Sequence, residues 1–191
     1  GQVEKIATNI QAAFVRLNDS VNGYLPLNQC EHAIFAGGHR EGQPLRPGDQ
    51  ILVQINRDAM KGKLPALTAN LNFSGKFLVL TTGNRKIGIS NKLSKEESSK
   101  LSKWLDDERN IPDRGYGLIA RTNAADASKE EFFHELDMLK KQYEKVAVYG
   151  RNRTCFSLLY ESEPFYLSAV RDIYGRDLDE IVTDISEMHT K

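Results

Sequence analysis

The 191-residue chain has little cysteine, and it has no excess of charge of either sign. Its two cysteines, Cys30 and Cys155, lie far apart and form no disulfide framework, so a reducing cytoplasm is expected. No apolar run approaches the length of a membrane span, and no charged-then-apolar leader stands at the start. These features predict a soluble globular cytoplasmic protein without a membrane partner, large enough to bury a core.

The sequence also lacks the motifs of common enzyme classes. It has no glycine-rich loop that would cradle a phosphate, and no Ser/His/Asp or Cys/His arrangement with a family-specific surround. Cys30, His32 and His39 have zinc-ligand chemistry, but a fourth ligand is missing, so no zinc site is expected. The acids of residues 106–108 are expected to form an exposed helix end, and those of residues 172–184 to be structural or solvated side chains.

The even balance of 26 basic and 26 acidic residues argues against nucleic-acid binding by net positive charge alone. The distribution is uneven, because residues 59–95 contain no Asp or Glu. The cations of this stretch are Lys61, Lys63, Lys76, Arg85, Lys86, Lys92 and Lys95. They predict a local positive field, and chance clustering on a solvated face is the alternative.

The first 70 residues favour short strands separated by turns. Apolar stretches occur near residues 12–17, 23–27, 50–55 and 66–73, and the strand at 50–55 is entered through a Pro-Gly-Asp turn. A loop rich in glycine, histidine and proline covers residues 36–47. Such a run of short strands is typical of a small β-barrel such as an OB fold.

The pattern then changes to alternating strands and helices. Strands are predicted at 77–80 and 117–122, and capping boxes at Ser94 and Ser128 each predict a helix start. The first helix is predicted to run toward Asp107. The second has one apolar face, made of Phe132, Leu136, Leu139, Tyr143 and Val146. This order of elements implies an α/β layer.

The pattern of the last part of the chain, from about residue 157, predicts the start of a third unit. Strands are predicted at 157–160 and 179–184, and a helix near Pro164 with an apolar face that includes Val170. One helix with two strands is a poor free-standing core, so truncation is expected here.

Two groups of residues are candidates for binding. Phe14 and Tyr24 lie on predicted barrel strands, where aromatic rings stack unpaired bases, with Lys61 or Lys63 beside the backbone. Burial of both rings in the core is the alternative. Arg121 and Thr122 end a strand before a helix, where a guanidinium, a hydroxyl and free N–H groups suit a terminal phosphate. An ion pair between Arg121 and Asp126 is the alternative.

Several short segments, taken in order, resemble the RNase E/G family of endoribonucleases, and the resemblance covers nearly the whole chain. They are residues 9–15 (NIQAAFV), 22–27 (NGYLPL), 47–55 (PGDQILVQI), 61–63 with 66–68 (KGK and ALT), 74–80 (SGKFLVL), 88–90 (GIS), 117–122 (GLIART) and 170–172 (VRD). The resemblance implies an α+β fold. An OB-fold RNA-binding domain would span residues 1–70, a 5′-sensor-like α/β subdomain 71–160, and the start of an RNase H-like segment 161–191.

The resemblance also assigns roles to residues. Phe14 and Tyr24 would stack RNA bases, and either Lys61 or Lys63 would contact phosphate. The residues implied for the 5′-monophosphate are Gly75, Val79, Lys92, Arg121 and Thr122. Family members often carry two arginines where this chain has Asn91 and Lys92, and neither of these side chains has the charged fork of an arginine.

The implied function is 5′-sensing and binding of single-stranded RNA within an endoribonuclease, a hydrolase of RNA processing or degradation. The family's catalytic aspartates and asparagine, which hold Mg²⁺, would lie beyond residue 191, so no catalytic or metal-binding residue and no cofactor are expected in this fragment, which by itself should be inactive. The full-length enzyme would use Mg²⁺ and could form homo-oligomers. The alternatives are a stand-alone single-stranded RNA-binding module, and a small-molecule enzyme built on the α/β part.

Overall fold

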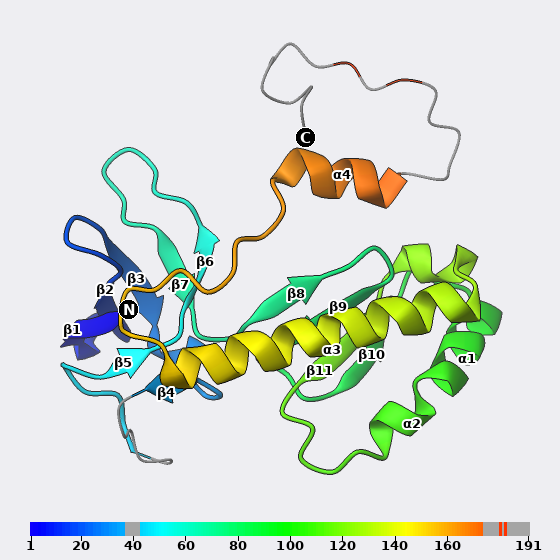
Figure 1. Ribbon diagram of the computed structural model, residues 1–191, viewed down its shortest axis with the longest axis horizontal. Coiled ribbons are helices and arrows are strands. Elements are labelled where there is room, and N and C mark those ends of the chain that lie inside the picture. The colour runs from blue at the N-terminus through cyan, green and yellow to red at the C-terminus, as the bar shows by residue number, and fades with distance from the viewer. Residues whose placement is uncertain (37–42, 174–179, 181, 183–191) are drawn as a thin grey trace. The chain divides into compact units, whose positions relative to one another are not determined.

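The computed structural model describes residues 1–36, 43–173, 180 and 182. Contacts group Gly1–Tyr160 into one compact unit and Glu161–Lys191 into a second. The first unit contains two sheets, which Figure 1 shows as the β1–β7 group and the β8–β11 group. The predicted domain boundaries near residues 70 and 160 remain predictions.

The first sheet has seven strands in the order β4-β5-β1-β2-β3-β7-β6. Their bounds are β1 Gln2–Ala7, β2 Ala12–Arg16, β3 Asn22–Pro26, β4 Phe35–Ala36, β5 Gln50–Ile51, β6 Gln54–Arg57 and β7 Ala66–Thr68. Short 3₁₀ helices η1 (Thr8–Ile10) and η2 (Leu27–Gln29) follow β1 and β3. Strands β1, β2 and β3 form an antiparallel meander, and β3 then pairs in parallel with β7.

This sheet curls back on itself through one segment, residues 50–57. Its first half, β5, pairs with β1, while its second half, β6, pairs with β7. A single straight strand over 50–55 was predicted, and this is wrong, because the chain breaks at Leu52 and Val53 to reach both partners. The curled sheet encloses a core of Val3, Ala13, Val15, Leu25, Ile51, Leu67 and Ala69. The mixed α+β architecture and the curled sheet are consistent with the predicted OB-like fold.

The second sheet has four strands in the order β10-β11-β9-β8. Their bounds are β8 Asn72–Ser74, β9 Leu78–Thr81, β10 Ile87–Ile89 and β11 Gly117–Ala120. Strand β10 runs parallel to β11, and β9 is antiparallel to both β11 and β8. The prediction of one strand over 66–73 is wrong, because β7 and β8 belong to different sheets and the chain crosses between them at residues 69–71.

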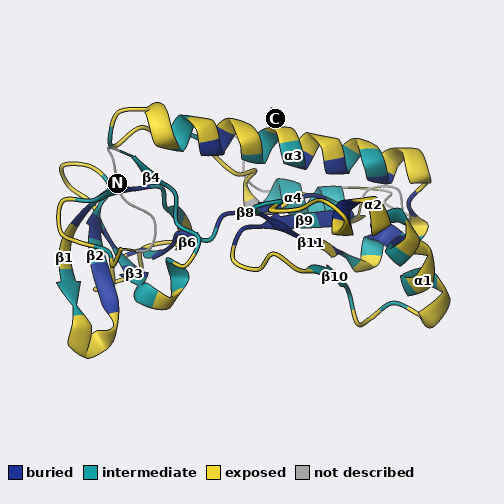
Figure 2. Ribbon diagram, turned by 90° about the horizontal axis from the view of Figure 1, so that it is seen from below, coloured by how far each residue is buried: buried dark blue, intermediate teal, exposed yellow. Residues whose placement is uncertain are grey.

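Helices cover one face of the second sheet. They are α1 (Lys95–Trp104), α2 (Asp106–Arg109) and α3 (Lys129–Asn152), with the 3₁₀ helix η3 (Thr122–Asp126) between β11 and α3. Helix α3 contacts β8 and β9, and its far end contacts β4 of the first sheet. Figure 2 shows the buried stripe of α3 turned toward the sheet. The predicted face is confirmed, because Phe132, Leu136, Leu139 and Val146 are buried and Tyr143 packs against the same core.

Both predicted helix starts are confirmed. The Ser94 and Ser128 hydroxyls accept from the N–H groups of Glu97 and Glu131, each at 3.2 Å. Each glutamate accepts from the serine N–H in return, which completes a capping box. These hydrogen bonds with the serines lower the pKa of both glutamates.

The acidic group at residues 106–108 differs in part from its prediction as an exposed helix end. Asp106 and Asp107 are exposed, but Glu108 is buried. The Glu108 carboxylate accepts from Lys140 Nζ at 2.8 Å and from the Tyr116 hydroxyl at 3.0 Å. Burial of Tyr116, with the Glu108 carboxylate beside it, raises the pKa of this tyrosine. Glu108 therefore ties α2 to α3.

The second unit contains α4 (Phe165–Ile173), which confirms the helix predicted near Pro164. The strand predicted at 157–160 is wrong, because these residues have no regular structure and Leu158 is 79% exposed. The strand predicted over 179–184 falls mainly outside the described residues.

Candidate nucleic-acid interface

Phe14 and Tyr24 form a pair of rings on the curled sheet. They are direct partners in the β2–β3 register, and their centroids lie 6.2 Å apart at an interplanar angle of 73°. This edge-to-face arrangement is favourable for aromatic pairs. Both side chains are half-buried, and neither belongs to the two core clusters among the described residues. The rings therefore keep accessible surface while holding each other in place.

Strand alternation explains why the rings avoid the core. Side chains of successive strand residues point to opposite faces of a sheet. Ala13, Val15 and Leu25, which flank the two rings in sequence, are fully buried in the core of the curled sheet. The alternative of two buried core rings is therefore wrong for both residues. Gly23 precedes Tyr24, and a Cβ there would lie 2.5 Å from the Leu67 side chain, so the close approach of β3 to β7 requires glycine.

The β1–β2 register places Lys5 beside the two rings, although the sequence analysis did not predict this residue as part of the site. Lys5 of β1 is exposed and lies directly opposite Phe14 in the ladder. A bulge at Glu4 produces this pairing, because β1 advances from Val3 to Lys5 while β2 advances by one residue. The poor alternation at the start of the chain was the signal, but it does not reveal which residue is the extra one. One row across three strands thus contains a cation and two aromatic rings.

The two candidate RNA-binding lysines lie on the connection between β6 and β7 of the first sheet. Met60 and Lys63 form a bridge that closes a tight turn, and Gly62 has a φ of +72° there, which favours glycine. Lys61 and Lys63 are both exposed. Lys63 lies three residues before Ala66, which pairs with Tyr24, so the hairpin leads from the lysines to the rings.

Three loops meet at one edge of the second sheet. Strands β10 and β11 are parallel and end together, and β9 starts opposite the end of β11, because Leu78 pairs with Ala120. The loop before β9 carries Gly75, the turn after β10 carries Lys92, and Arg121 and Thr122 follow β11 directly. Residues 75, 92 and 121, which are distant in sequence, therefore converge at this edge.

Arg121 is held against the loop before β9. Its Nη1 donates to the Gly75 carbonyl at 2.5 Å and to the Lys76 carbonyl at 3.5 Å, and its backbone N–H donates to the Phe77 carbonyl at 2.8 Å. The side chain is half-buried, so the guanidinium has a defined position at the edge.

Gly75 is buried, and the loop that follows it surrounds a carboxylate. The N–H groups of Lys76, Phe77 and Leu78 each donate to the Glu135 carboxylate at 2.8 Å. The free N–H groups were predicted after Arg121, toward the helix start, while in the loop before β9 the three amides already have an acceptor. The helix start is also separate from Arg121, because η3 intervenes and Ser128 caps α3.

The remaining predicted residues lie at or near the same edge. Val79 pairs with Ile119, and its side chain is half-buried, while Ile119 on the same face is 42% exposed. Lys92 is exposed in a turn closed by the Leu93 N–H, which donates to the Ser90 carbonyl at 3.2 Å. Thr122 is exposed at the first position of η3. The face with Val79 and Ile119 is opposite to the helix-covered one.

The described residues offer no metal centre. No three His, Cys, Asp or Glu side chains gather in a metal-binding group within residues 1–36 and 43–173. Burial raises the pKa of the Cys30 thiol to about 11, which disfavours the thiolate form that binds zinc. His39 lies outside the described residues. The residues described here therefore do not fit the Mg²⁺ that the family resemblance implies for a full-length enzyme.

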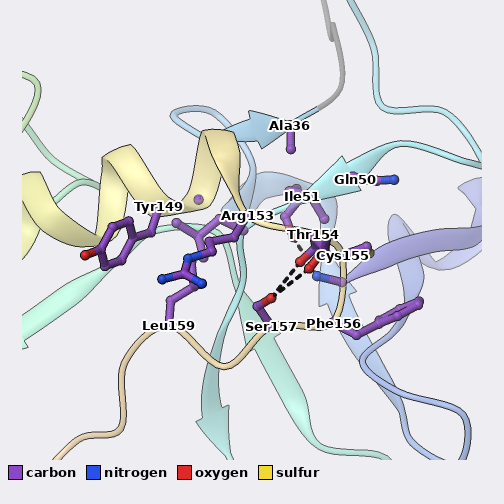
Figure 3. Close-up of a pocket in the computed structure, with 13 residues that line it drawn as sticks. Ala36, Gln50, Ile51, Tyr149, Arg153, Thr154, Cys155, Phe156, Ser157 and Leu159 are labelled. Carbon is purple, nitrogen blue, oxygen red and sulfur yellow. Dashed lines mark hydrogen bonds between the residues drawn. The ribbon is translucent and has the colours of Figure 1, made fainter.

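A hollow that is open to solvent lies between the C-terminal end of α3 and strand β5 (Figure 3). Its polar lining comes from Gln50, Tyr149, Arg153 and Ser157, among others. None of the predicted site residues lines it. The hollow is therefore separate from the ring pair and from the edge with Arg121.

A model of the Ribonuclease E/G family matches residues 72–191, which include the edge with Arg121. The chain belongs to the ribonuclease E/G family. It is 29% identical over 198 residues to ribonuclease E of Haemophilus influenzae, covering 100% of the chain and 21% of that relative. It is also 29% identical to ribonuclease E of Escherichia coli, with 96% of the chain and 18% of the relative covered.

A ribonuclease E/G-like protein of Pyropia yezoensis is 30% identical over 96% of the chain and 36% of that relative. The chain thus spans about a fifth to a third of these relatives. Membership of the ribonuclease E/G family was predicted and is confirmed, while the roles of single residues stay predictions. In the described part of the chain, no helix has the length and apolarity needed to cross a membrane.

Proposed function

We propose that this chain is the RNA-binding and 5′-monophosphate-sensing portion of a ribonuclease E/G-type endoribonuclease, which acts on single-stranded RNA in RNA processing or decay. Family membership supports the RNA substrate class. In this proposal the cytoplasm is the site of action, and the full-length enzyme forms homo-oligomers. Cleavage depends on Mg²⁺-holding residues outside these 191, so the chain alone binds RNA without cutting it.

The convergence of three loops around Arg121 is the observation that carries the sensing role. Arg121 lies beside Gly75, with Thr122 next to it and Lys92 in the neighbouring turn. A terminal phosphate carries up to two negative charges and several acceptor oxygens, so it suits a guanidinium with a hydroxyl and an ammonium group nearby. An internal phosphodiester carries one charge and no free terminus, so it gains less from this cluster.

The ring pair supports the binding of unpaired bases. Each base stacked on an aromatic ring contributes about 1–3 kcal/mol, and every base has a flat face that can stack. Phe14 and Tyr24 supply the rings, while Lys5, Lys61 and Lys63 supply exposed cations on the same barrel. Double-stranded RNA would not offer its bases to these rings.

Two separate contacts with one RNA strand make the binding bivalent. When the 5′ end is held at Arg121, a downstream segment stays at high effective concentration near the rings. This coupling would favour RNAs with a 5′-monophosphate over those with a 5′-hydroxyl. The preference comes from the end group, while general affinity comes from the barrel.

A binding titration with oligoribonucleotides that differ only at the 5′ end tests the proposal. The unmutated chain should bind 5′-monophosphate RNA roughly 10- to 150-fold more tightly, the range for a hydrogen bond to a charged group. Arg121→Ala should bring both affinities to the 5′-hydroxyl value. Arg85→Ala is the matched control, because Arg85 is exposed in the loop before β10, at the opposite end of the sheet.

The titration is run at two salt concentrations, so that a loss of general charge is separated from a loss of end recognition. Equal affinity of the unmutated chain for both RNAs would show that the sensing role is wrong. Arg85→Ala should weaken the binding of both RNAs to the same extent and leave the ratio of their Kd values unchanged.

A further inference from the structure

Glu135 occupies a position that nothing in its local sequence indicates. It lies on α3, next to the buried Leu136 and three residues after the buried Phe132, so the inner face of the helix carries it toward the sheet. One carboxylate oxygen accepts from Phe77 N–H and Leu78 N–H, and the other accepts from Lys76 N–H. Three successive amides therefore point at one side chain.

Gly75 is required by this carboxylate. A Cβ at position 75 would lie 2.3 Å from the Glu135 carboxyl carbon and from one of its oxygens. Real Cβ atoms do not approach other atoms so closely, so any larger residue at this position would push the carboxylate away from the amides. The conformation of Gly75 does not need glycine for a positive φ, since it is not among the positive-φ residues described.

The same loop holds Arg121 from its other side. The three amides of residues 76–78 face Glu135, while the carbonyls of Gly75 and Lys76 accept from Arg121 Nη1. The Gly75 N–H also donates to the Leu78 carbonyl at 2.8 Å, which closes the turn. Glu135 thus fixes the peptide groups whose carbonyls fix the guanidinium.

We infer that Glu135 is a positioning residue for end recognition: its carboxylate fixes the loop at residues 75–78 and, through that loop, orients Arg121 toward a terminal phosphate. The inference rests on the proposed sensing function. A preorganised guanidinium loses less freedom when a phosphate binds, which increases the affinity for that end group. Glu135 itself does not contact the RNA.

The charge of Glu135 has an effect of opposite sign, which makes the test decisive. A carboxylate near an anion site repels a phosphate, so its removal would strengthen phosphate binding if charge were its main effect. If orientation of Arg121 is its main effect, removal weakens phosphate binding. The two readings therefore predict opposite changes in one ratio, the 5′-hydroxyl Kd divided by the 5′-monophosphate Kd.

The experiment measures this ratio for the unmutated chain and for Glu135→Gln, Gly75→Ala and Asp137→Asn. Glu135→Gln removes the charge and one acceptor, while Gly75→Ala displaces the carboxylate by steric contact and leaves the charge in the protein. Asp137→Asn is the control, because Asp137 is an exposed acid on the same helix. The ratio should fall about tenfold in the first two variants and stay unchanged in the third.

The double variant Glu135→Gln with Arg121→Ala tests whether the Glu135 charge acts on the phosphate independently of Arg121. If Glu135 acts through Arg121, the double variant has the same ratio as Arg121→Ala alone, so the effects are not additive. A thermal unfolding curve is measured for each variant. If Glu135→Gln does not fold, the Kd ratio of Gly75→Ala tests the inference.

Each remaining outcome contradicts the inference in a recognisable way. An unchanged or increased ratio in Glu135→Gln and Gly75→Ala would overturn the role of Glu135 and leave the proposed function intact. If these variants bind both RNAs more weakly by the same factor, Glu135 stabilises the fold and does not orient Arg121. A ratio of one in the unmutated chain would instead refute the sensing function itself.

Discussion

Replacement of Phe14 by alanine tests whether the ring pair is a binding platform. The variant removes a half-buried ring that lies opposite Tyr24 and outside both core clusters. One lost stack costs about 1–3 kcal/mol of binding free energy, which corresponds to a roughly 5- to 150-fold weaker Kd. Tyr24 also loses its edge-to-face partner, which costs about 0.5–1.5 kcal/mol of folding stability.

The fold should survive this change, because Ala12, Ala13 and Val15 on the same strand are fully buried and keep β2 in place. The assay is a fluorescence anisotropy titration with 5′-hydroxyl single-stranded RNA, which isolates the barrel from end recognition. Phe14→Leu serves as the matched control, since leucine keeps an apolar side chain and lacks a flat ring. It should retain most of the stability and lose most of the affinity.

Two results would refute the reasoning. Binding by Phe14→Leu as tight as that of the unmutated chain would mean that apolar contact, and not stacking, accounts for the affinity. Global unfolding of Phe14→Ala in circular dichroism would mean that the ring belongs to the core after all. The loss of RNA affinity in Phe14→Ala should also be equal at low and high salt, because stacking does not release counterions.

Two further predictions follow from contacts elsewhere in the chain. Alanine in place of whichever of Lys61 and Lys63 contacts a phosphate should reduce the slope of log affinity against log salt by about 0.7, and unchanged slopes in both variants would remove this hairpin from the interface. Glu108→Ala should lower the free energy of unfolding by about 1–3 kcal/mol in urea titrations, because Lys140 Nζ and the Tyr116 hydroxyl lose their acceptor. The exposed Asp107→Ala is its control, and a similar loss there would contradict a specific role of Glu108.

The helices could be predicted from the sequence because their signals are local. A capping box spans four residues, and the apolar face of α3 repeats every three to four residues. Both patterns act within one element and need no knowledge of its partner. For this reason Ser94 and Ser128 begin helices as predicted, and Phe132 and Leu136 are buried.

The strands could be predicted only in part, because an apolar run does not say which strand it pairs with. Residues 50–57 had to break at Leu52 and Val53 to bond with both β1 and β7. Residues 66–73 had to divide between two sheets. Both breaks follow from long-range strand pairing, which cannot be detected in a short window of sequence.

In the candidate site, too, some features follow from local sequence and others only from contacts between distant residues. By itself, the sequence determined the helix starts, the basic stretch and the segments that resemble the ribonuclease E/G family, because each depends on neighbouring residues. Only the tertiary structure placed Lys5 opposite Phe14, through a bulge, and brought Glu135 to amides 57 to 59 positions away. Contacts between distant residues arise when packing closes long loops, so no local pattern of residues encodes them.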